Sequence, residues 1–306
     1  MVYLNEHTIN VGEFPNGETY YDVDKRWIET KKNIIRVKFQ SNEDITTLMF
    51  IKDFVDTYAA RNTPCHLVIP YMPYSRMDRQ EEKRLFTLKT LCKFINSMNF
   101  DSIQIWEPHS DACVNMLDRV EVVNKSAELA YQTMMDDLGL SGSAWLSKSE
   151  TNHEYGFGIR NLHKKAEEAG IYFVYPDAGA EKRYSKQITY PHFITATKRR
   201  DFNTGRITSI SLNTPMVSED ATPFNTAIIV DDLCSKGGTF AGAAVELKKL
   251  GFKYIVLVVT HCEYTIFDGD LPKSGIIDKI VTTESILSRY FEDMGYNHGQ
   301  LEFDIR

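Results

Sequence analysis

Two adjacent acids, Asp231 and Asp232, are the residues of this sequence with the clearest chemical potential. They follow a short apolar run, Ala227 to Val230, and they precede the glycine-containing segment Ser235 to Thr239 and a helix-like stretch. Carboxylates bind sugar hydroxyls, glycines let the backbone approach a ligand closely, and the N-terminus of a helix offers amide N–H groups to an anion. An ordinary strand, loop and helix with two surface acids is the alternative. The combination favours a site for a sugar phosphate.

Two further polar groups follow predicted strands. Asp177 comes after the apolar run Ile171 to Tyr175 and precedes small residues and a helix, so we expect it to contact a cation or a sugar. His109 follows the strand predicted over Ser102 to Trp106. It fits a Mg²⁺ site only modestly, because Mg²⁺ prefers oxygen ligands and water. Open α/β sheets bind their ligands at the carboxyl ends of the strands, where all these groups are expected.

Two basic stretches are candidates for binding phosphate. Arg76 and Arg79 follow a strand predicted over 65–70, and charge-assisted hydrogen bonds from these side chains would hold a polyphosphate. Lys198 and Arg200, with their basic neighbours, follow the start of another strand. They would form a mobile cationic flap, because fixed positive charge stabilises a phosphoryl transition state. A solvated basic loop and an exposed basic hairpin are the respective alternatives.

The elements that position these residues alternate between strand and helix, which predicts an α/β fold with mainly parallel sheets. A length of 306 residues favours two domains, and we place them at 1–124 and 125–306. Glycine and serine residues predict a loop over 139–158. We expect helices over 45–60, 85–98, 127–138 and 160–169, and strands over 34–39, 65–70, 102–106, 120–123, 171–175, 227–230, 254–260 and 278–282.

Composition narrows the class of protein. Hydrophobic residues make up 42% and charged residues 25% of the chain, as in a globular protein. No apolar run reaches the roughly 20 residues of a membrane span, and the first residues lack a signal-peptide pattern, so we expect a cytoplasmic protein without membrane partners. Five widely spaced cysteines indicate neither a disulfide framework nor a zinc site. A net charge of −7 argues against nucleic-acid binding.

Several separated stretches together resemble one family along nearly the whole chain. The sequence is similar to ribose-phosphate diphosphokinases, also called phosphoribosyl diphosphate synthetases. Ordinary phosphoribosyltransferases share the stretch around Asp231 and lack the PYMPYSRMDR element. The matching stretches are FPNGE from Phe14, VIPYMPYSRMDR from Val68, EPHSD from Glu107, YPDAGAEKR from Tyr175, TKRR from Thr197, IIVDDLCSKGGT from Ile228 and VTHC from Val259.

The resemblance implies two phosphoribosyltransferase-like (type I) domains, Mg²⁺ dependence and a homo-oligomer built from dimers. It also implies that the anomeric hydroxyl of ribose 5-phosphate attacks the β-phosphorus of ATP, with AMP as the leaving group. By matching position, ATP would contact Phe14, Asn16, Glu18, Arg76, Met77, Asp78, Arg79 and His109. Mg²⁺ would lie at His109 and Asp177, and the transferring diphosphoryl group would contact Lys198 and Arg200. Ribose phosphate would contact Asp177, Asp231, Asp232, Ser235, Lys236, Gly237, Gly238 and Thr239.

Departures from the family pattern leave the acceptor open. Met77 stands where glutamine is usual, Lys236 adds charge beside the expected phosphate loop, and the segment 139–169 is longer than usual. The first alternative is therefore the same chemistry on a larger acceptor such as ADP-ribose, which divergent phage relatives of this family use in NAD resynthesis. If the protein is viral, the cytoplasm in which we expect it is that of the host cell. A phosphoribosyltransferase and a non-catalytic, synthetase-associated regulatory protein are the further alternatives.

Overall fold

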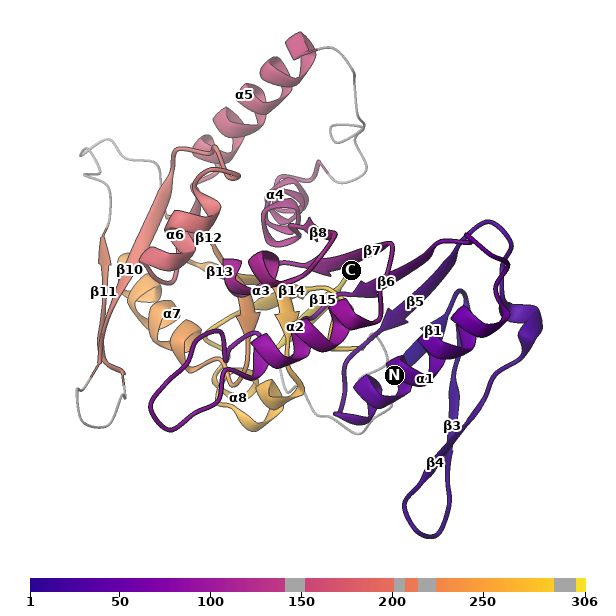
Figure 1. Ribbon diagram of the computed structural model, residues 1–306. Helices are drawn as coiled ribbons and strands as arrows, with labels where there is room; N and C mark the ends of the chain where they lie inside the picture. The colour runs from indigo at the N-terminus through magenta and orange to yellow at the C-terminus, as the bar shows by residue number, and fades with distance from the viewer. Residues whose placement is uncertain (141–151, 201–206, 214–223, 289–300) are drawn as a thin grey trace. The chain divides into compact units, whose positions relative to one another are not determined.

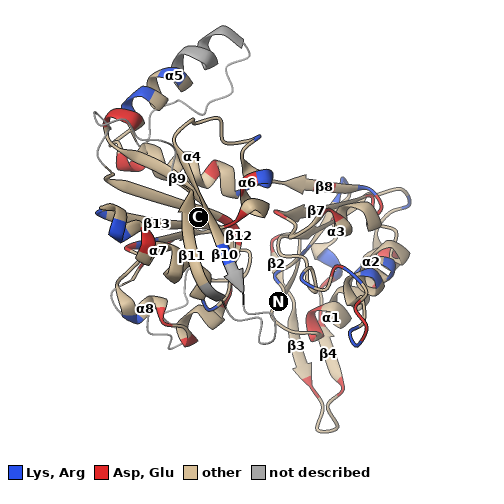
Figure 2. Ribbon diagram, turned by 90° about the vertical axis from the view of Figure 1, so that its left-hand side faces the viewer, with Lys and Arg blue, Asp and Glu red and all other residues tan. Residues whose placement is uncertain are grey.

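The computed structural model describes two compact units, Met1–Asn124 (unit 1) and Lys125–Arg306 (unit 2), each with its own sheet (Figure 1). The description covers residues 1–140, 152–200, 207–213, 224–288 and 301–306, and it leaves out the side chains of 152–158, 199–200 and 207–208. Basic and acidic residues are interspersed over both units (Figure 2). Among the described helices, none combines the length and apolar character needed to cross a membrane.

Unit 1 contains a six-stranded sheet in the order β2-β1-β5-β6-β7-β8. Strands β5 to β8 are parallel, and β1 is antiparallel to both β2 and β5. Apolar side chains of β6 and β7 pack with those of α1 and α2 into one core. The elements are β1 (Val2–Leu4), β2 (His7–Thr8), η1 (Lys25–Trp27), β5 (Asn33–Val37), α1 (Glu43–Tyr58), β6 (Cys65–Ile69), α2 (Thr87–Ser97), β7 (Ser102–Trp106), α3 (Asp111–Met116) and β8 (Val120–Val123).

A hairpin in unit 1 forms a separate two-stranded sheet. Its strands, β3 (Asn10–Glu13) and β4 (Thr19–Asp22), pair antiparallel, and Figure 1 shows them extending away from the six-stranded sheet. The strands pack closely at Gly12, where an added Cβ would lie 2.1 Å from the Tyr20 ring. The turn Phe14–Glu18 is therefore presented at the tip of a narrow arm.

Unit 2 contains a seven-stranded sheet in the order β11-β10-β9-β12-β13-β14-β15. All its strands are parallel except β11, which pairs antiparallel with β10. The elements are α4 (Ser126–Asp137), α5 (Asn152–Glu168), β9 (Ile171–Tyr175), α6 (Ala178–Tyr184), β10 (Phe193–Arg200), β11 (Ile207–Asn213), β12 (Thr226–Cys234), α7 (Gly238–Leu250), β13 (Tyr254–Cys262), η3 (Tyr264–Asp268), α8 (Leu271–Ser274), β14 (Lys279–Thr282) and β15 (Glu302–Ile305).

The central strand β12 is buried on both faces, which explains its unbroken apolar sequence. Ala227 and Ile229 belong to the core that includes Leu247 of α7, whereas Ile228 and Val230 belong to the opposite core with α4. A strand covered by helices on both sides needs apolar residues at every position rather than at every second one. The predicted fold class, two α/β domains with mainly parallel sheets, is confirmed.

Three local predictions are wrong in their boundaries. β12 does not end at Val230 but continues through both aspartates, because β13 pairs with it as far as Cys234. The basic residues Lys198 to Arg200 lie within β10, not in a turn, because β11 pairs alongside them. α5 starts at Asn152, where a loop was expected; its glycines each cost about 1 kcal/mol of helix propensity relative to alanine without ending the helix.

Candidate active site

The polar residues predicted in unit 2 gather at the carboxyl ends of its parallel strands. β9, β10, β12 and β13 run in the same direction, so the segments that follow them leave the sheet at one edge. Asp177 follows β9, Lys198 lies near the end of β10, and Asp231 lies in the last part of β12. This is the edge at which open α/β sheets bind ligands.

Asp177 and Lys198 form an ion pair at this edge. The Nζ atom of Lys198 lies 2.9 Å from Oδ2 of Asp177, and Oδ1 accepts a hydrogen bond from the Ala180 amide at 3.0 Å. Asp177 is thus also the N-cap of α6. Burial alone would raise the pKa of Asp177, but the hydrogen bonds from Lys198 and Ala180 outweigh it and lower the pKa. Asp177 is consequently an anion at neutral pH.

The two aspartates in β12 have different electrostatic surroundings. Asp232 is 4% exposed, and its Oδ2 lies 3.2 Å from an Nη atom of Arg183. The Asp232 amide donates to Oδ1 of Asp231 at 2.9 Å. Burial raises the pKa of Asp231 well above its usual value, repulsion by Asp232 raises it further, and Asp177 adds to the effect. The acids Asp177, Asp231 and Asp232 thus outnumber the two cations that pair with them, Lys198 and Arg183.

Arg183 is a site residue for which the sequence assigned no role. It lies near the end of α6, the helix that Asp177 caps, and it reaches Asp232 on a different strand. Burial would lower the pKa of Arg183, but attraction by Asp232 outweighs this and raises it. The available signal was the shared helix: α6 is only seven residues long, which is short enough to bring both of its ends near the same acids.

A network of buried hydroxyl groups contacts the backbone of Asp231. The hydroxyl of Ser126, at the start of α4, donates to the carbonyl oxygen of Asp231 at 2.8 Å and lies 2.9 Å from Oγ1 of Thr260. The carbonyl oxygen of Thr260 in turn accepts hydrogen bonds from the hydroxyls of Thr283 and Ser285 at 2.6 and 3.0 Å. These side chains are buried. Such a satisfied network holds the backbone of Asp231 in one position.

The glycine-containing segment forms the turn into α7. Gly237 has φ = 78°, a left-handed conformation that favours glycine, and an added Cβ would lie 2.1 Å from Cδ1 of Leu271. Gly238 starts the helix and has open space at its Cβ position. Gly237 provides no side-chain cap. The first amide groups of α7 are accordingly suited to an anion.

The other residues of this segment surround the turn. The hydroxyl of Ser235 lies 3.0 Å from that of Thr265, which also donates to Glu263 at 3.0 Å. Lys236 is exposed and Thr239 is half-buried. The side chain of Arg200 lies outside the described part of the structure, although its backbone belongs to β10. Five predicted acceptor-site residues are thus contiguous at the same strand edge as the aspartate pair.

The predicted adenine-binding residues lie at the tip of the β3–β4 hairpin in unit 1. The amide of Phe14 donates to the Glu18 carbonyl at 2.8 Å, and Gly17, with φ = 87°, closes the turn. Asn16 donates to the carboxylate of Glu18 at 2.9 Å. Phe14 is 50% exposed and contacts the ring of Tyr20 with a centroid separation of 5.1 Å. The tip therefore presents an aromatic face beside an ordered amide and carboxylate.

The predicted polyphosphate-binding residues lie in the loop between β6 and α2. Arg76 and Arg79 are exposed, whereas Met77 and Asp78 are half-buried. Glu81 lies 3.6 Å from Arg79 and 3.5 Å from Arg84. His109 is exposed in the segment after β7, which leaves the same sheet edge because β6 and β7 are parallel. The two predicted loops are therefore neighbours at the carboxyl edge of unit 1.

The predicted Mg²⁺ ligands, His109 and Asp177, do not form a complete metal site by themselves. Among the described residues, no three His, Cys, Asp or Glu side chains are grouped as a metal site, and His109 and Asp177 belong to different units. Mg²⁺ usually keeps several waters and takes one or two carboxylates together with substrate phosphates. The close grouping of Asp177, Asp231 and Asp232 fits a divalent cation that arrives with a phosphorylated substrate.

Comparison with known proteins identifies relatives over nearly the whole chain. Residues 2–98 match the N-terminal domain of ribose phosphate pyrophosphokinase. The ribose-phosphate pyrophosphokinase of Sulfurisphaera tokodaii is 22% identical over 280 residues, which are 89% of this chain and 82% of the relative. The corresponding protein of Pyrococcus abyssi is 24% identical over 283 residues, 91% of this chain and 84% of the relative.

The fold also has a counterpart among solved structures. The phosphoribosylpyrophosphate synthetase from Mycobacterium smegmatis superposes with a TM-score of 0.65, at 17% identity, over 97% of this chain and 86% of that chain. At this identity the superposition shows a common fold. Together with the sequence matches across both units, it leads to one conclusion: this chain is similar to ribose-phosphate pyrophosphokinases over nearly its whole length and has the fold of a phosphoribosylpyrophosphate synthetase.

Proposed function

We propose that the protein transfers the β,γ-diphosphoryl group of ATP to the anomeric hydroxyl of ribose 5-phosphate, giving phosphoribosyl diphosphate and AMP. The observation that carries this proposal is the common sheet edge of unit 2. It holds the Lys198–Asp177 ion pair, the Asp231–Asp232 pair and the uncapped start of α7. A cation for phosphate, carboxylates for hydroxyls and amides for a terminal phosphate are the groups that this reaction requires.

Each group has a distinct task in this reaction. Asp231 and Asp232 accept hydrogen bonds from the ribose hydroxyls, and Ser126 fixes the backbone of Asp231. The segment Ser235 to Thr239 holds the 5-phosphate with its amide groups. Lys198, together with Arg200, stabilises the charge on the diphosphoryl group as it transfers. The protein thereby supplies position and electrostatic stabilisation, which are its main contributions in phosphoryl transfer.

Mg²⁺ would neutralise charge on the phosphate oxygens when bound with the substrate. Asp177 is the carboxylate in unit 2 that we assign to its site. Both oxygens of Asp177 accept hydrogen bonds, one from Lys198 and the other from Ala180. A ligand that takes the Oδ2 position would release Lys198 toward the phosphate. The ion pair would then serve to hold Lys198 in place before the substrate binds.

We assign ATP binding to unit 1. Phe14 offers a ring for stacking on adenine, and Asn16 and Glu18 form a preordered pair of hydrogen-bonding groups. Arg76 and Arg79 bind the phosphate chain, and His109 lies on the neighbouring loop. Met77 cannot provide the polar contacts of a glutamine, so the phosphates depend more strongly on these arginines.

An AMP-release assay with purified protein, ATP and Mg²⁺ tests this function. Ribose 5-phosphate and ADP-ribose are compared as acceptors at equal concentrations, with EDTA as the control for metal dependence. We expect turnover of ribose 5-phosphate and its loss with EDTA. Faster turnover of ADP-ribose than of ribose 5-phosphate would show that ADP-ribose is the acceptor, and the proposed diphosphoryl transfer would still hold. Absence of turnover with either acceptor, combined with binding to an active synthetase, would identify a regulatory protein instead.

The assembly is a separate prediction. We propose a homo-oligomer built from dimers, which light scattering coupled to size-exclusion chromatography measures directly. A mass of 35.2 kDa at micromolar concentration, the mass of one chain, would contradict it.

A further inference from the structure

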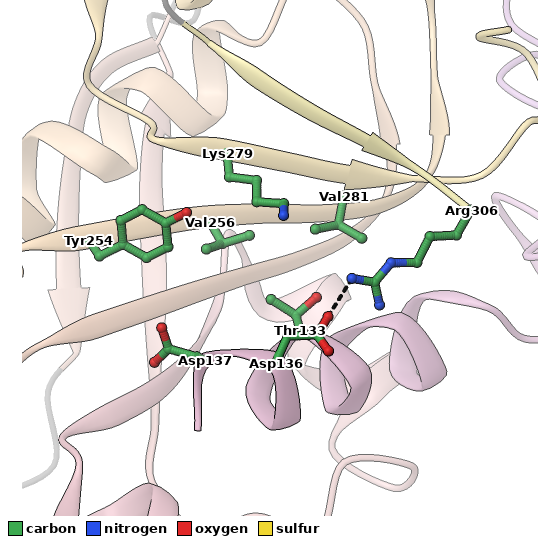
Figure 3. Close-up of a pocket in the computed structure, with 8 residues that line it drawn as sticks. All are labelled: Thr133, Asp136, Asp137, Tyr254, Val256, Lys279, Val281 and Arg306. Carbon is green, nitrogen blue, oxygen red and sulfur yellow. Dashed lines mark hydrogen bonds and ion pairs between the residues drawn. The ribbon is translucent and has the colours of Figure 1, made fainter. Parts of the chain in front are cut away.

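A cavity of about 310 Å³ lies in unit 2 between α4 and the sheet (Figure 3). Its sheet wall includes Tyr254 and Lys279, the first residues of β13 and β14, and its helix wall includes Asp136 and Asp137, the last residues of α4. The catalytic candidates lie at the opposite edge of the same sheet, at the carboxyl ends of β9, β10 and β12. The cavity is thus distinct from the site at Asp231, and its volume is in the range of small-molecule sites.

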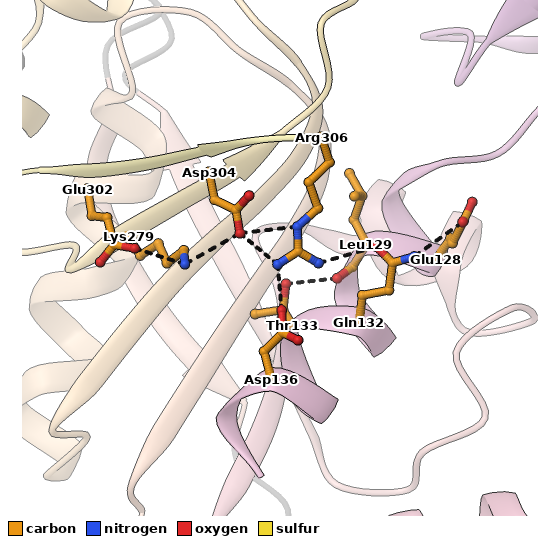
Figure 4. Close-up of polar contacts among 9 residues, drawn as sticks. All are labelled: Glu128, Leu129, Gln132, Thr133, Asp136, Lys279, Glu302, Asp304 and Arg306. Carbon is orange, nitrogen blue, oxygen red and sulfur yellow. Dashed lines mark hydrogen bonds and ion pairs between the residues drawn. The ribbon is translucent and has the colours of Figure 1, made fainter. Parts of the chain in front are cut away.

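Both cations that line the cavity are neutralised by carboxylates. Figure 4 shows Arg306 hydrogen-bonded to Asp136 and Asp304, and Lys279 placed between Glu302 and Asp304. The Nζ atom of Lys279 lies 2.9 Å from the Glu302 carboxylate and 3.4 Å from that of Asp304. These cations are therefore poorly suited to attract a further anion.

Asp137 differs from the other acids at the cavity. Its Oδ2 accepts a hydrogen bond from the hydroxyl of Thr226 at 3.0 Å, and within the described residues no cation pairs with it. Four carboxylates, those of Asp136, Asp137, Glu302 and Asp304, thus surround two cations. Burial raises the pKa of Tyr254, and the charge of Glu302 raises it further, which is consistent with negative surroundings.

The floor of the cavity is apolar. Val256 and Val281 are buried side chains of β13 and β14, and both line it (Figure 3). A ligand that fills the space therefore needs an apolar stem as well as a positive charge. We propose that the cavity binds a small organic amine, with its ammonium group at Asp137 and its stem against the two valines.

α4 connects this cavity with the aspartate pair. Asp137 is its last residue, and Ser126, its first, donates to the carbonyl oxygen of Asp231 at 2.8 Å. The strand β12 gives a second connection, because Thr226 at its start bonds Asp137 and Asp231 lies near its end. An amine in the cavity thereby stabilises both elements that hold Asp231.

Calorimetric titration of the full chain tests the proposal. The probes are 1,4-diaminobutane and n-butylamine, with 1,4-butanediol, butyrate and inorganic phosphate as comparison ligands at constant ionic strength. We expect the amines to bind with a Kd of about 1 mM, in line with ligands of this size, and more tightly than every comparison ligand. Asp137→Asn should weaken amine binding about tenfold.

Glu128→Gln is the matched control, because it removes another exposed carboxylate from the same helix, outside the cavity. It should leave amine binding unchanged. Hydrogen exchange gives a readout independent of catalysis: the amine should slow exchange in α4 and around Asp231 in the wild type, and not in Asp137→Asn. Equal amine affinity in wild type and a folded Asp137→Asn, no amine binding by the wild type, or tighter binding of phosphate or butyrate would overturn the proposal.

Discussion

The ammonium group of Lys198 lies 2.9 Å from the carboxylate of Asp177, although Lys198 belongs to strand β10 and Asp177 precedes the helix that follows the neighbouring strand β9. The Lys198 side chain is 11% exposed, whereas that of Asp177 is 44% exposed. Lys198 is therefore held by packing and by the ion pair, while the acid is accessible to a ligand. This asymmetry suits a cation that is positioned before the substrate arrives.

Replacement of Lys198 tests its role in the chemical step. Lys198→Ala should lower kcat by at least about 100-fold, as removal of one charge-stabilising group does elsewhere, while ATP affinity stays within about twofold. The measurements are single-turnover AMP release and ATP titration. Lys186→Ala is the control, because Lys186 is an exposed lysine just after α6. An unchanged kcat in Lys198→Ala would remove Lys198 from the mechanism.

Asp231 should destabilise the free protein at neutral pH. Its folded-state pKa is raised, mainly by burial and then by Asp232, so the carboxyl costs stability that is greatest above the folded pKa and declines as pH falls toward the unfolded pKa. Asp231→Asn should therefore raise Tm at pH 8 by about 2–4 °C, for a gain of about 1 kcal/mol, and abolish turnover.

Thermal unfolding of Asp231→Asn between pH 5 and pH 8 measures this effect. The gain in Tm should shrink as pH falls from 8 to 5, because the stability cost of the wild-type carboxyl declines as pH approaches its unfolded pKa. Asp118→Asn, at an exposed acid of unit 1, should show no gain at any pH. A lower Tm in Asp231→Asn at pH 8 would contradict the electrostatic interpretation.

The two glycines before and in α7 should respond differently to alanine. Gly237→Ala forces a side chain into a left-handed backbone and against Leu271, so it should destabilise the protein by about 1–3 kcal/mol. Gly238→Ala meets no atom within 4 Å and should leave Tm unchanged. It should nevertheless raise KM for ribose 5-phosphate, because its methyl group occupies space at the helix start.

Urea unfolding and initial-rate kinetics on both variants decide between structural and ligand-binding roles. Gly251→Ala, at the other end of α7, is a control with a left-handed backbone and open space. An unchanged KM for ribose 5-phosphate in Gly238→Ala would place the phosphate elsewhere.

The hairpin tip should contribute to ATP binding without contributing to stability. Phe14→Ala removes a ring that is 50% exposed, so Tm should change little, while loss of stacking on adenine should raise KM for ATP about three- to tenfold. Val11→Ala is the control, since Val11 is 48% exposed on the same hairpin. Equal KM values in wild type and Phe14→Ala would exclude the tip from the nucleotide site.

The sequence alone determined the fold class and most elements. The unbroken apolar run of β12 predicted a strand covered on both faces, and strand–helix alternation predicted the parallel sheets, because local periodicity reflects burial directly. It also placed Asp177, Asp231 and the glycine-containing segment toward the carboxyl edge of the sheet. Sequence could not set how far β12 and β10 extend, because their last residues are held by pairing with β13 and β11.

Only the tertiary structure decided which side chains meet. Arg183 reaches Asp232, Lys198 reaches Asp177, and Ser126 reaches Asp231 across 105 positions of the chain. The cavity beside Asp137 likewise depends on α4 lying over the starts of β13 and β14. The physical reason is that motifs encode chemistry and local conformation, whereas contacts and pKa values arise from groups brought together by packing, which no local pattern contains.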